Sequence, residues 1–267
     1  MNDRPSLTAL AVCWMRATER LRGDRVLDDP YAEAFLPRSW ARTVRLGALA
    51  PRGGLASFVV LRHRFIDDAI VAHPTEQVVL LGAGYDSRPW RLAIDTTWFE
   101  VDHPATLRRR HRVAQRLQLP SPTSVPVDFR HDDLAQCLDQ AGHRPDLSTT
   151  WVWEGVSMYL GRDEVVATLE ALRARSAPGS QLVLDLWHRV DGLRRRDGLR
   201  RALPAGLEII GEPLRFGLHP GDAPGWLAQH GWSTTEVQCN ASLKGDASDG
   251  LRPDPSMAVA RAIPFVS

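Results

Sequence analysis

The stretch Gln77-Val-Val-Leu-Leu-Gly-Ala-Gly-Tyr-Asp86 decides the fold of this 267-residue chain. Its first half is apolar and partly β-branched, which is typical of a strand buried on both faces of a parallel sheet. Gly82 and Gly84 then permit a positive φ or the close approach of a ligand. Asp86 or Ser87 can cap a helix after the turn. The stretch therefore predicts the strand, turn and helix that begin a nucleotide-binding α/β sheet.

A second apolar run, Trp98-Phe-Glu-Val-Asp102, ends on an acid 18 residues after Gly84. At this spacing a carboxylate can accept hydrogen bonds from the ribose hydroxyls of an adenosine-like ligand. A dinucleotide site would need a third glycine at position 87, where this chain has Ser. S-adenosylmethionine has no pyrophosphate and tolerates a looser loop, so the pattern favours it. A tight turn under the sheet is the alternative interpretation of the glycines taken alone.

The composition indicates one compact domain with a small-molecule or peptide partner. Hydrophobic residues make up 43% of the chain, which is ample for a core, and the formal net charge is +1. So small a charge argues against nucleic acid or an anionic membrane as a partner. Cys13, Cys137 and Cys239 lie far apart without CxxC spacing, so we expect separate thiols and no metal. No charged and apolar leader and no run near 18 apolar residues is present, so we expect a soluble, cytoplasmic protein.

Apolar runs alternate with helical stretches from residue 77 onward, as in an open sheet with helices on both faces. Five successive strands are predicted at 77–81, 97–101, 124–128, 149–154 and 181–186, with helices near 87–93, 104–118, 132–141 and 162–176. Two further strands, 232–240 and 256–263, follow a short helix near 222–230 and would form an antiparallel hairpin at the sheet edge. The predicted fold is α/β, with a seven-stranded, mostly parallel, Rossmann-like sheet.

The chain divides into a helical N-terminal extension, residues 1–75, and a ligand-binding domain, residues 76–267. Pro37 and Pro51 break the extension into several helices. An extension of this length would pack on the sheet or fold over the ligand. After the fifth strand, a charged and then Gly/Pro-interrupted segment at about 189–225 predicts a lid over the site.

Five motifs occur in order along the chain. They are Arg62-His-Arg-Phe-Ile-Asp67, Leu81-Gly-Ala-Gly-Tyr-Asp-Ser-Arg88, Phe99-Glu-Val-Asp-His-Pro104, Val127-Asp-Phe129 and Trp153-Glu-Gly-Val-Ser-Met-Tyr-Leu160. Together with Arg16-Ala-Thr-Glu19 and Asp29-Pro-Tyr-Ala32, they resemble the leucine carboxyl methyltransferase family, in particular its bacterial branch with polyketide carboxyl O-methyltransferases. The resemblance covers most of the chain. It implies a class I methyltransferase fold, S-adenosylmethionine as cofactor, and methylation of a carboxylate on a small molecule or peptide.

The resemblance also implies which residues bind the cofactor. Gly82, Ala83 and Gly84 would lie under the methionine part, Asp102 on the ribose, Asp128 with Phe129 around the adenine, Glu154 beside the methionine ammonium, and Arg62 with Arg16 at its carboxylate.

The arginines themselves leave an alternative open. Arg62 and Arg64 are two positions apart, so on a helix they point to different sides and only one can face the ligand. A planar guanidinium suits a carboxylate because it donates two parallel hydrogen bonds. Arg62 could instead form an ion pair with Asp67 or Asp68 on the same helix.

Two acids are expected at strand ends, where open α/β sheets bind ligands. Glu154 follows a strand that is otherwise fit for burial, so its carboxylate must find a donor or become protonated. A ligand ammonium would serve as that donor. Asp128 could offer its carboxylate to the adenine amino group, with Phe129 packed on the base, or it could cap the next turn.

A carboxylate acceptor is ionised at neutral pH and needs no general base, so alignment in a water-poor pocket would carry catalysis. A phenol or alcohol acceptor would need a base, for which His103, His188 and His219 are the candidates. Each of them can equally be structural, and His103-Pro104 is also typical of a helix start. Trp187, just after the fifth strand, could stack on an acceptor or belong to the core.

Three other functions stay open on the sequence alone. The first is methylation of a phenol, nitrogen or carbon on a natural product, and the second is a non-catalytic module that binds S-adenosylmethionine. The third is an NAD-dependent oxidoreductase, which the missing third glycine disfavours. The sequence leaves the oligomeric state open.

Overall fold

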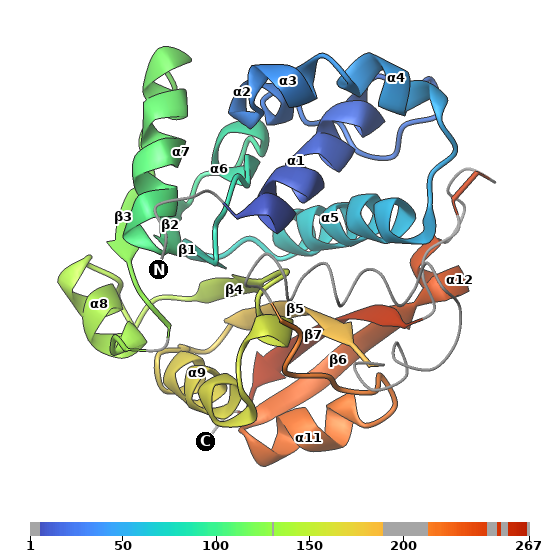
Figure 1. Ribbon diagram of the computed structural model, residues 1–267. Coiled ribbons are helices and arrows are strands. Elements are labelled where there is room, and N and C mark those ends of the chain that lie inside the picture. The colour runs from blue at the N-terminus through green and yellow to red at the C-terminus, as the bar shows by residue number, and fades with distance from the viewer. Residues whose placement is uncertain (1–5, 130, 189–212, 245–249, 252–255, 266–267) are drawn as a thin grey trace.

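A seven-stranded sheet forms the centre of the computed structural model, which describes residues 6–129, 131–188, 213–244, 250–251 and 256–265 (Figure 1). The strand order is β3-β2-β1-β4-β5-β7-β6. The strands are β1 Gln77–Leu81, β2 Thr97–Asp102, β3 Thr123–Pro126, β4 Thr149–Trp153, β5 Gln181–Trp187, β6 Trp232–Cys239 and β7 Met257–Pro264. All seven predicted strands are confirmed, and no strand end differs from its prediction by more than two residues.

The direction of the strands also agrees with the prediction. The first five strands pair in parallel, while β7 runs antiparallel to both β5 and β6. From β1, strands β2 and β3 are added on one side and β4 and β5 on the other, so the strand order reverses direction beside β1. In open α/β sheets this reversal leaves a crevice at the carboxyl ends of the strands, where ligands bind. The glycine turn after β1 lies at that point.

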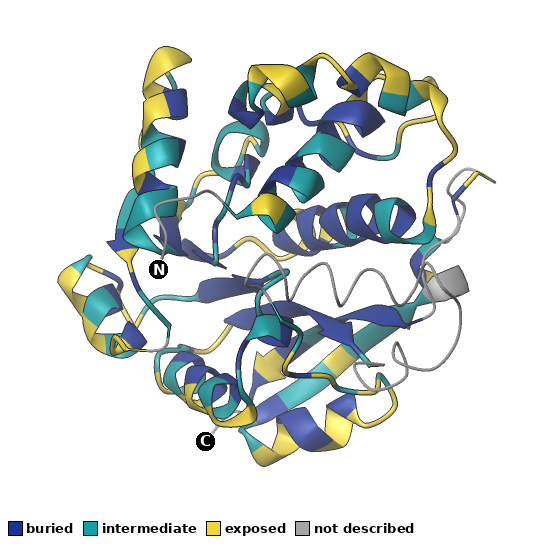
Figure 2. Ribbon diagram, in the orientation of Figure 1, coloured by how far each residue is buried: buried dark blue, intermediate teal, exposed yellow. Residues whose placement is uncertain are grey.

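Alternation along β1 divides the core into two layers. Val79 and Leu81 face helices α8 (Leu134–Gln140) and α9 (Arg162–Ala174). Val78 and Leu80 face helix α5 (Gly54–Ala72) on the other side of the sheet. Every residue of β1, β4 and β5 is buried, as Figure 2 shows by the dark centre of the sheet. This is why these strands read as continuous apolar runs and not as alternating patterns.

Helices before β1 lie together on one side of the sheet (Figure 1). They are α1 Leu7–Arg20, α2 Ala32–Phe35, α3 Arg38–Ala41, α4 Val44–Leu49 and α5 Gly54–Ala72. The α5 helix packs Ile66 and Ile70 against the strands, and α1 contacts α2, α4 and α5. Pro37 stands at the N-cap of α3, where its fixed φ fits and no helical N–H is lost.

The remaining helices follow β1 in the sequence, either between successive strands or after the fifth strand. They are α6 Arg88–Arg91, α7 Pro104–Arg116, α8 Leu134–Gln140, η1 Ser157–Tyr159, α9 Arg162–Ala174, α11 Ala223–Gln229 and α12 Asn240–Lys244. Each helix predicted after β1 is present but shorter than expected. The predicted lid at 189–225 lies largely outside the described residues. The structure describes only its last part, from residue 213, which includes the start of α11.

Candidate functional site

The glycine turn after β1 is held in a conformation that demands glycine. Gly82 has φ +69° and Gly84 has φ +48°. A Cβ added to Gly82 would lie 2.2 Å from Val156 Cγ2, so the side of the turn that faces the end of β4 has no room for a side chain. The backbone N–H groups of Gly82 and Ala83 both donate to the carbonyl of Val101, at 2.8 and 3.0 Å. These two bonds fold the turn across the end of β2.

Asp102 stands beside this turn at the carboxyl end of β2. Its Oδ2 accepts a hydrogen bond from the N–H of Gly84 at 2.7 Å, and its Oδ1 accepts one from the N–H of His103 at 2.6 Å. Burial raises the pKa of Asp102 above its ordinary value, although both hydrogen bonds oppose the shift. The structure therefore brings together the glycines and the acid that the sequence paired.

Glu154 directly follows β4 and has donors at both oxygens. Its Oε1 lies 2.7 Å from Arg62 Nε and 2.9 Å from His63 Nδ1, and its Oε2 lies 2.7 Å from Arg88 Nη1. Burial disfavours the charge, but these neighbours hold the pKa of Glu154 well below its ordinary value. The carboxylate is thus ionised and points into a cluster of basic side chains.

Arg62 connects α5 to the end of β4 and to the interior of β5. Besides Glu154, it donates from Nη1 to Asp185 Oδ2 at 2.5 Å, and the other oxygen of Asp185 accepts the N–H of Gly155 at 2.9 Å. The alternative pairing of Arg62 with its helix neighbours is wrong, because Asp67 binds Arg88 and Arg91 instead.

Arg16 brings the N-terminal helix α1 to the same place. It is 2% exposed, and its Nη2 donates to the carbonyl of Tyr85 in the glycine turn at 2.6 Å. Its Nη1 lies 3.5 Å from Asp29 Oδ2 and 3.4 Å from His63 Nε2. Because α1 lies across the turn, a Cβ on Gly84 would be 3.7 Å from Ala9.

Asp128 lies in the loop after β3, and its prediction as the last residue of that strand is wrong. The β3 strand ends at Pro126, and the N–H of Val127 then donates to the carbonyl of Asp102 at 3.0 Å. Asp128 begins a turn in which Asp132 Oδ2 accepts its N–H at 2.8 Å, while its own carboxylate faces the exposed ring of His131. Phe129 is partly buried against the core layer on the side of α8 and α9.

The three candidate histidines have different surroundings. His103 caps α7, because its Nδ1 accepts the N–H of Ala105 at 3.2 Å, and this bond occupies the lone pair that a base would use. His188 and His219 lie together beyond β5, with ring centroids 4.8 Å apart. Trp187 is buried in a core layer with Phe58.

Seven side chains in the charged cluster around Arg16, Arg62 and Glu154 were not singled out as site residues by the sequence. Arg88 is fully buried and binds the carboxylates of Asp67, Asp86 and Glu154. Arg88 lowers the pKa of Asp86 to about 2 although burial opposes the charge. His63, Asp185, Asp29 and Arg91 complete the set. Of these residues, Asp185 could have been found from the sequence. It stands in the middle of the apolar run Gln181-Leu-Val-Leu-Asp-Leu-Trp187, and a buried carboxylate needs a partner.

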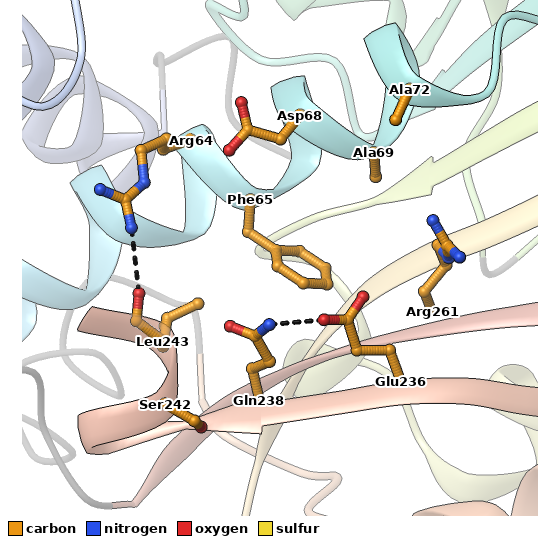
Figure 3. Close-up of a pocket in the computed structure, with 10 residues that line it drawn as sticks. All are labelled: Arg64, Phe65, Asp68, Ala69, Ala72, Glu236, Gln238, Ser242, Leu243 and Arg261. Carbon is orange, nitrogen blue, oxygen red and sulfur yellow. Dashed lines mark hydrogen bonds between the residues drawn. The ribbon is translucent and has the colours of Figure 1, made fainter. Parts of the chain in front are cut away.

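A separate cavity of about 370 Å³ lies between α5 and the β6–β7 hairpin (Figure 3). Arg64, Phe65, Asp68, Ala69, Ala72, Glu236, Gln238, Ser242, Leu243 and Arg261 line it. Arg64 points into this cavity while Arg62 joins the charged cluster, so the two arginines do face different sides of α5.

Among the described residues, no cluster of three or more His, Cys, Asp or Glu side chains is suited to a metal ion. No single described helix is long and apolar enough to cross a membrane, although the bent pair Arg38–Leu49 and Gly54–Ala72 meets the criteria of length and composition when taken together.

Comparisons with known proteins identify the family. Residues 9–173 match the leucine carboxyl methyltransferase family. A protein of Frankia alni named as an S-adenosyl-L-methionine-dependent methyltransferase is 35% identical, over 93% of this chain and 89% of its own. A similarly named protein of Streptomyces coelicolor is 35% identical over 87% and 83%. The solved structure of a pyocyanin biosynthetic protein aligns with a TM-score of 0.52 at 10% identity, over 89% of this chain and 62% of that one. The chain therefore belongs to the leucine carboxyl methyltransferase family and is an S-adenosylmethionine-dependent methyltransferase.

Proposed function

We propose that this enzyme methylates a carboxylate oxygen on a small molecule of polyketide type or on a peptide. The observation that carries the cofactor site is the buried charged cluster beside the glycine turn. Among the described residues it contains four guanidinium groups, of Arg16, Arg62, Arg88 and Arg91, and five carboxylates, of Asp29, Asp67, Asp86, Glu154 and Asp185. One negative charge is in excess, which suits S-adenosylmethionine because its sulfonium, ammonium and carboxylate sum to one positive charge.

The cofactor residues fit the two ends of this ligand. Glycine at positions 82 and 84 leaves the turn without side chains, and Ala83 adds only a methyl group. We assign the ribose to Asp102 and the adenine to Asp128 with Phe129. Arg62 and Glu154 lie side by side, so they offer both charges that an amino acid zwitterion needs.

Arg16 would act at the methionine carboxylate together with Arg62. It is anchored at the glycine turn through Tyr85, so it approaches the same point from the N-terminal extension. We propose that residues 1–75 cover the cofactor in this way and that residues 76–267 form the domain that binds it, with the segment at about 189–225 as its lid.

The carboxylate acceptor is supported by the description of the family and by chemistry. When bound, S-adenosylmethionine supplies an electrophilic methyl group. A carboxylate is already ionised at neutral pH, so the protein need only hold it in line and exclude water. Orientation of this kind can contribute on the order of 7 kcal/mol.

A phenol or alcohol acceptor is the second candidate, and one observation favours it. His188 and His219 lie together beyond the carboxyl end of β5, two strands from β1, where an acceptor could approach the cofactor. Either ring could then take the proton that such an acceptor must lose.

We also propose a cytoplasmic location. Cys13, Cys137 and Cys239 are all unpaired, as is usual in a reducing compartment.

The test of the acceptor uses the lability of the product. The enzyme is incubated with methyl-labelled S-adenosylmethionine and a panel of aliphatic acids, aromatic acids and peptides with free carboxyl termini, and the products are treated with mild base. A methyl ester releases labelled methanol, whereas a phenol ether or an N-methyl group keeps the label. We expect release of methanol with at least one acid. Label that resists base would establish the second candidate, and cofactor binding without any transfer would indicate a non-catalytic module.

A further inference from the structure

His63 is a buried histidine at the centre of the charged cluster, with 2% of its surface exposed. It lies on α5 next to Arg62. On one side of the ring, Nδ1 is 2.9 Å from Glu154 Oε1 and 2.9 Å from the carbonyl oxygen of Val59. On the other side, Nε2 is 3.4 Å from Nη1 of Arg16. The ring therefore spans the gap between the acid that follows β4 and a base of α1.

These contacts determine the tautomer. Both neighbours of Nδ1 are oxygens that only accept, so Nδ1 must carry a proton. The guanidinium of Arg16 only donates, so Nε2 must present its lone pair. Neutral imidazole with its proton on Nδ1 fits this arrangement, with the one N–H shared between the two oxygens and the lone pair of Nε2 turned to Arg16. Burial lowers the pKa of His63, with Glu154 opposing that effect and Arg88 and Arg16 reinforcing it, and a neutral ring agrees with this direction.

The orientation of Glu154 depends on this ring. Its Oε1 accepts a hydrogen bond from Arg62 Nε and lies 2.9 Å from His63 Nδ1, and both side chains come from the same helix. Through Nε2 the ring also receives Arg16, whose other nitrogen holds the carbonyl of Tyr85. A continuous chain of close polar contacts thus runs from the glycine turn through Arg16 and His63 to Glu154.

We propose that His63 is a positioning residue for cofactor binding, because its imidazole joins Arg16 of the N-terminal helix to the carboxylate of Glu154. This inference rests on the proposed placement of those two side chains at the methionine part of S-adenosylmethionine. The ring itself need not touch the cofactor. It holds the acid at a fixed angle and keeps the arginine beside the glycine turn.

Three substitutions separate the parts of this role. His63→Asn keeps an amide N–H close to the position of Nδ1, so Glu154 retains its donor. His63→Gln moves the amide toward the position of Nε2 and removes that donor. His63→Leu removes both contacts while keeping an apolar side chain of similar size. A matched control is His143→Leu. His143 is also buried, and burial lowers the pKa of its ring, but it binds Thr149 at the opposite end of β4.

The measurement is the dissociation constant of S-adenosylmethionine by calorimetry on the full chain, with thermal unfolding recorded in parallel. We expect His63→Leu and His63→Gln to weaken binding about tenfold, the factor for one lost hydrogen bond to a charged group. His63→Asn should stay within about twofold of the unchanged protein. His143→Leu should lower the unfolding temperature without changing the affinity.

Equal affinities for the Asn and Gln variants would overturn the proposal, as would a tight-binding His63→Leu or an equal loss in His143→Leu. If His63→Leu does not fold, the comparison of Asn with Gln still decides. Failure of the unchanged protein to bind S-adenosylmethionine is a different outcome, which would remove the proposed cofactor site itself.

Discussion

Arg62 Nε donates to Glu154 Oε1 at 2.7 Å, and the two residues are 92 positions apart in the chain. The pair joins helix α5 to the end of β4, and both side chains are less than one tenth exposed. Burying two charges costs several kcal/mol, which their attraction offsets only when hydrogen bonds satisfy the remaining atoms. Asp185 and Arg88 provide those bonds. Such a pair therefore contributes little net stability. Its effect is to fix the position of α5 relative to the end of β4.

Glu154→Gln should weaken S-adenosylmethionine binding about tenfold or more, because an amide cannot balance the ligand ammonium. The amide oxygen can still accept from Arg62, but the amide N–H₂ would face the guanidinium of Arg88, so we expect a folded protein of lower stability. Calorimetry and thermal unfolding would measure the two effects separately. Glu170→Gln is the control, since Glu170 is exposed and lies 3.8 Å from its ion-pair partner His230. Unchanged affinity together with a lower unfolding temperature would assign Glu154 a purely structural role.

Asp102→Asn should also reduce the affinity for the cofactor, because one carboxylate can accept from both ribose hydroxyls and an amide cannot. Some stability should be lost as well, because the amide N–H₂ of Asn is a donor and would replace an oxygen that accepts the N–H of Gly84 or of His103. The control is Asp133→Asn. Asp133 accepts two backbone N–H groups at the start of α8, so its replacement costs stability alone. If both variants bind the cofactor as the unchanged protein does, the ribose assignment fails.

The sheet could be predicted from sequence because each strand carries its own signal. A run such as Gln77–Leu81 is apolar throughout and ends in glycine, and no distant partner is needed to recognise it. Asp102 could be predicted for the same reason, since the acid follows such a run at a known spacing. Helix ends were less accurate because they depend on capping contacts. Asp128 was misplaced because the strand stops at Pro126, although Val127 still reads as apolar.

The charged cluster could not be predicted, because its pairs join distant parts of the chain. Arg88 and Glu154 are 66 positions apart, and Arg62 and Asp185 are 123 apart. Nothing in the local pattern tells which carboxylate a buried arginine will meet. Arg62 entered the site through the family resemblance alone. Glu154 was also expected from its place at the end of a buried strand, whereas His63 stood within a recognised motif without an assigned role.

Gly82→Ala should destabilise the protein more than Gly142→Ala. Both glycines have positive φ, which costs an L-residue roughly 1–2 kcal/mol. Only at Gly82 would the new Cβ also meet a side chain, Val156 Cγ2 at 2.2 Å, whereas nothing lies within 4 Å at Gly142. Urea unfolding of both variants measures the difference. The second substitution Val156→Ala should restore part of the loss in Gly82→Ala, and no restoration would mean that the steric explanation is wrong.

His143 gives the stability a dependence on pH that can be isolated. Burial lowers its pKa to about 4, so the unfolded chain binds more protons between pH 6.5 and pH 4. Stability must then fall as the pH falls through this window, by up to about 1.4 kcal/mol per unit from this residue. We expect His143→Leu to be less stable than the unchanged protein at pH 7 but to lose less stability on acidification to pH 5. Urea unfolding at the two pH values tests this, and parallel losses in both proteins would show that His143 does not titrate as proposed.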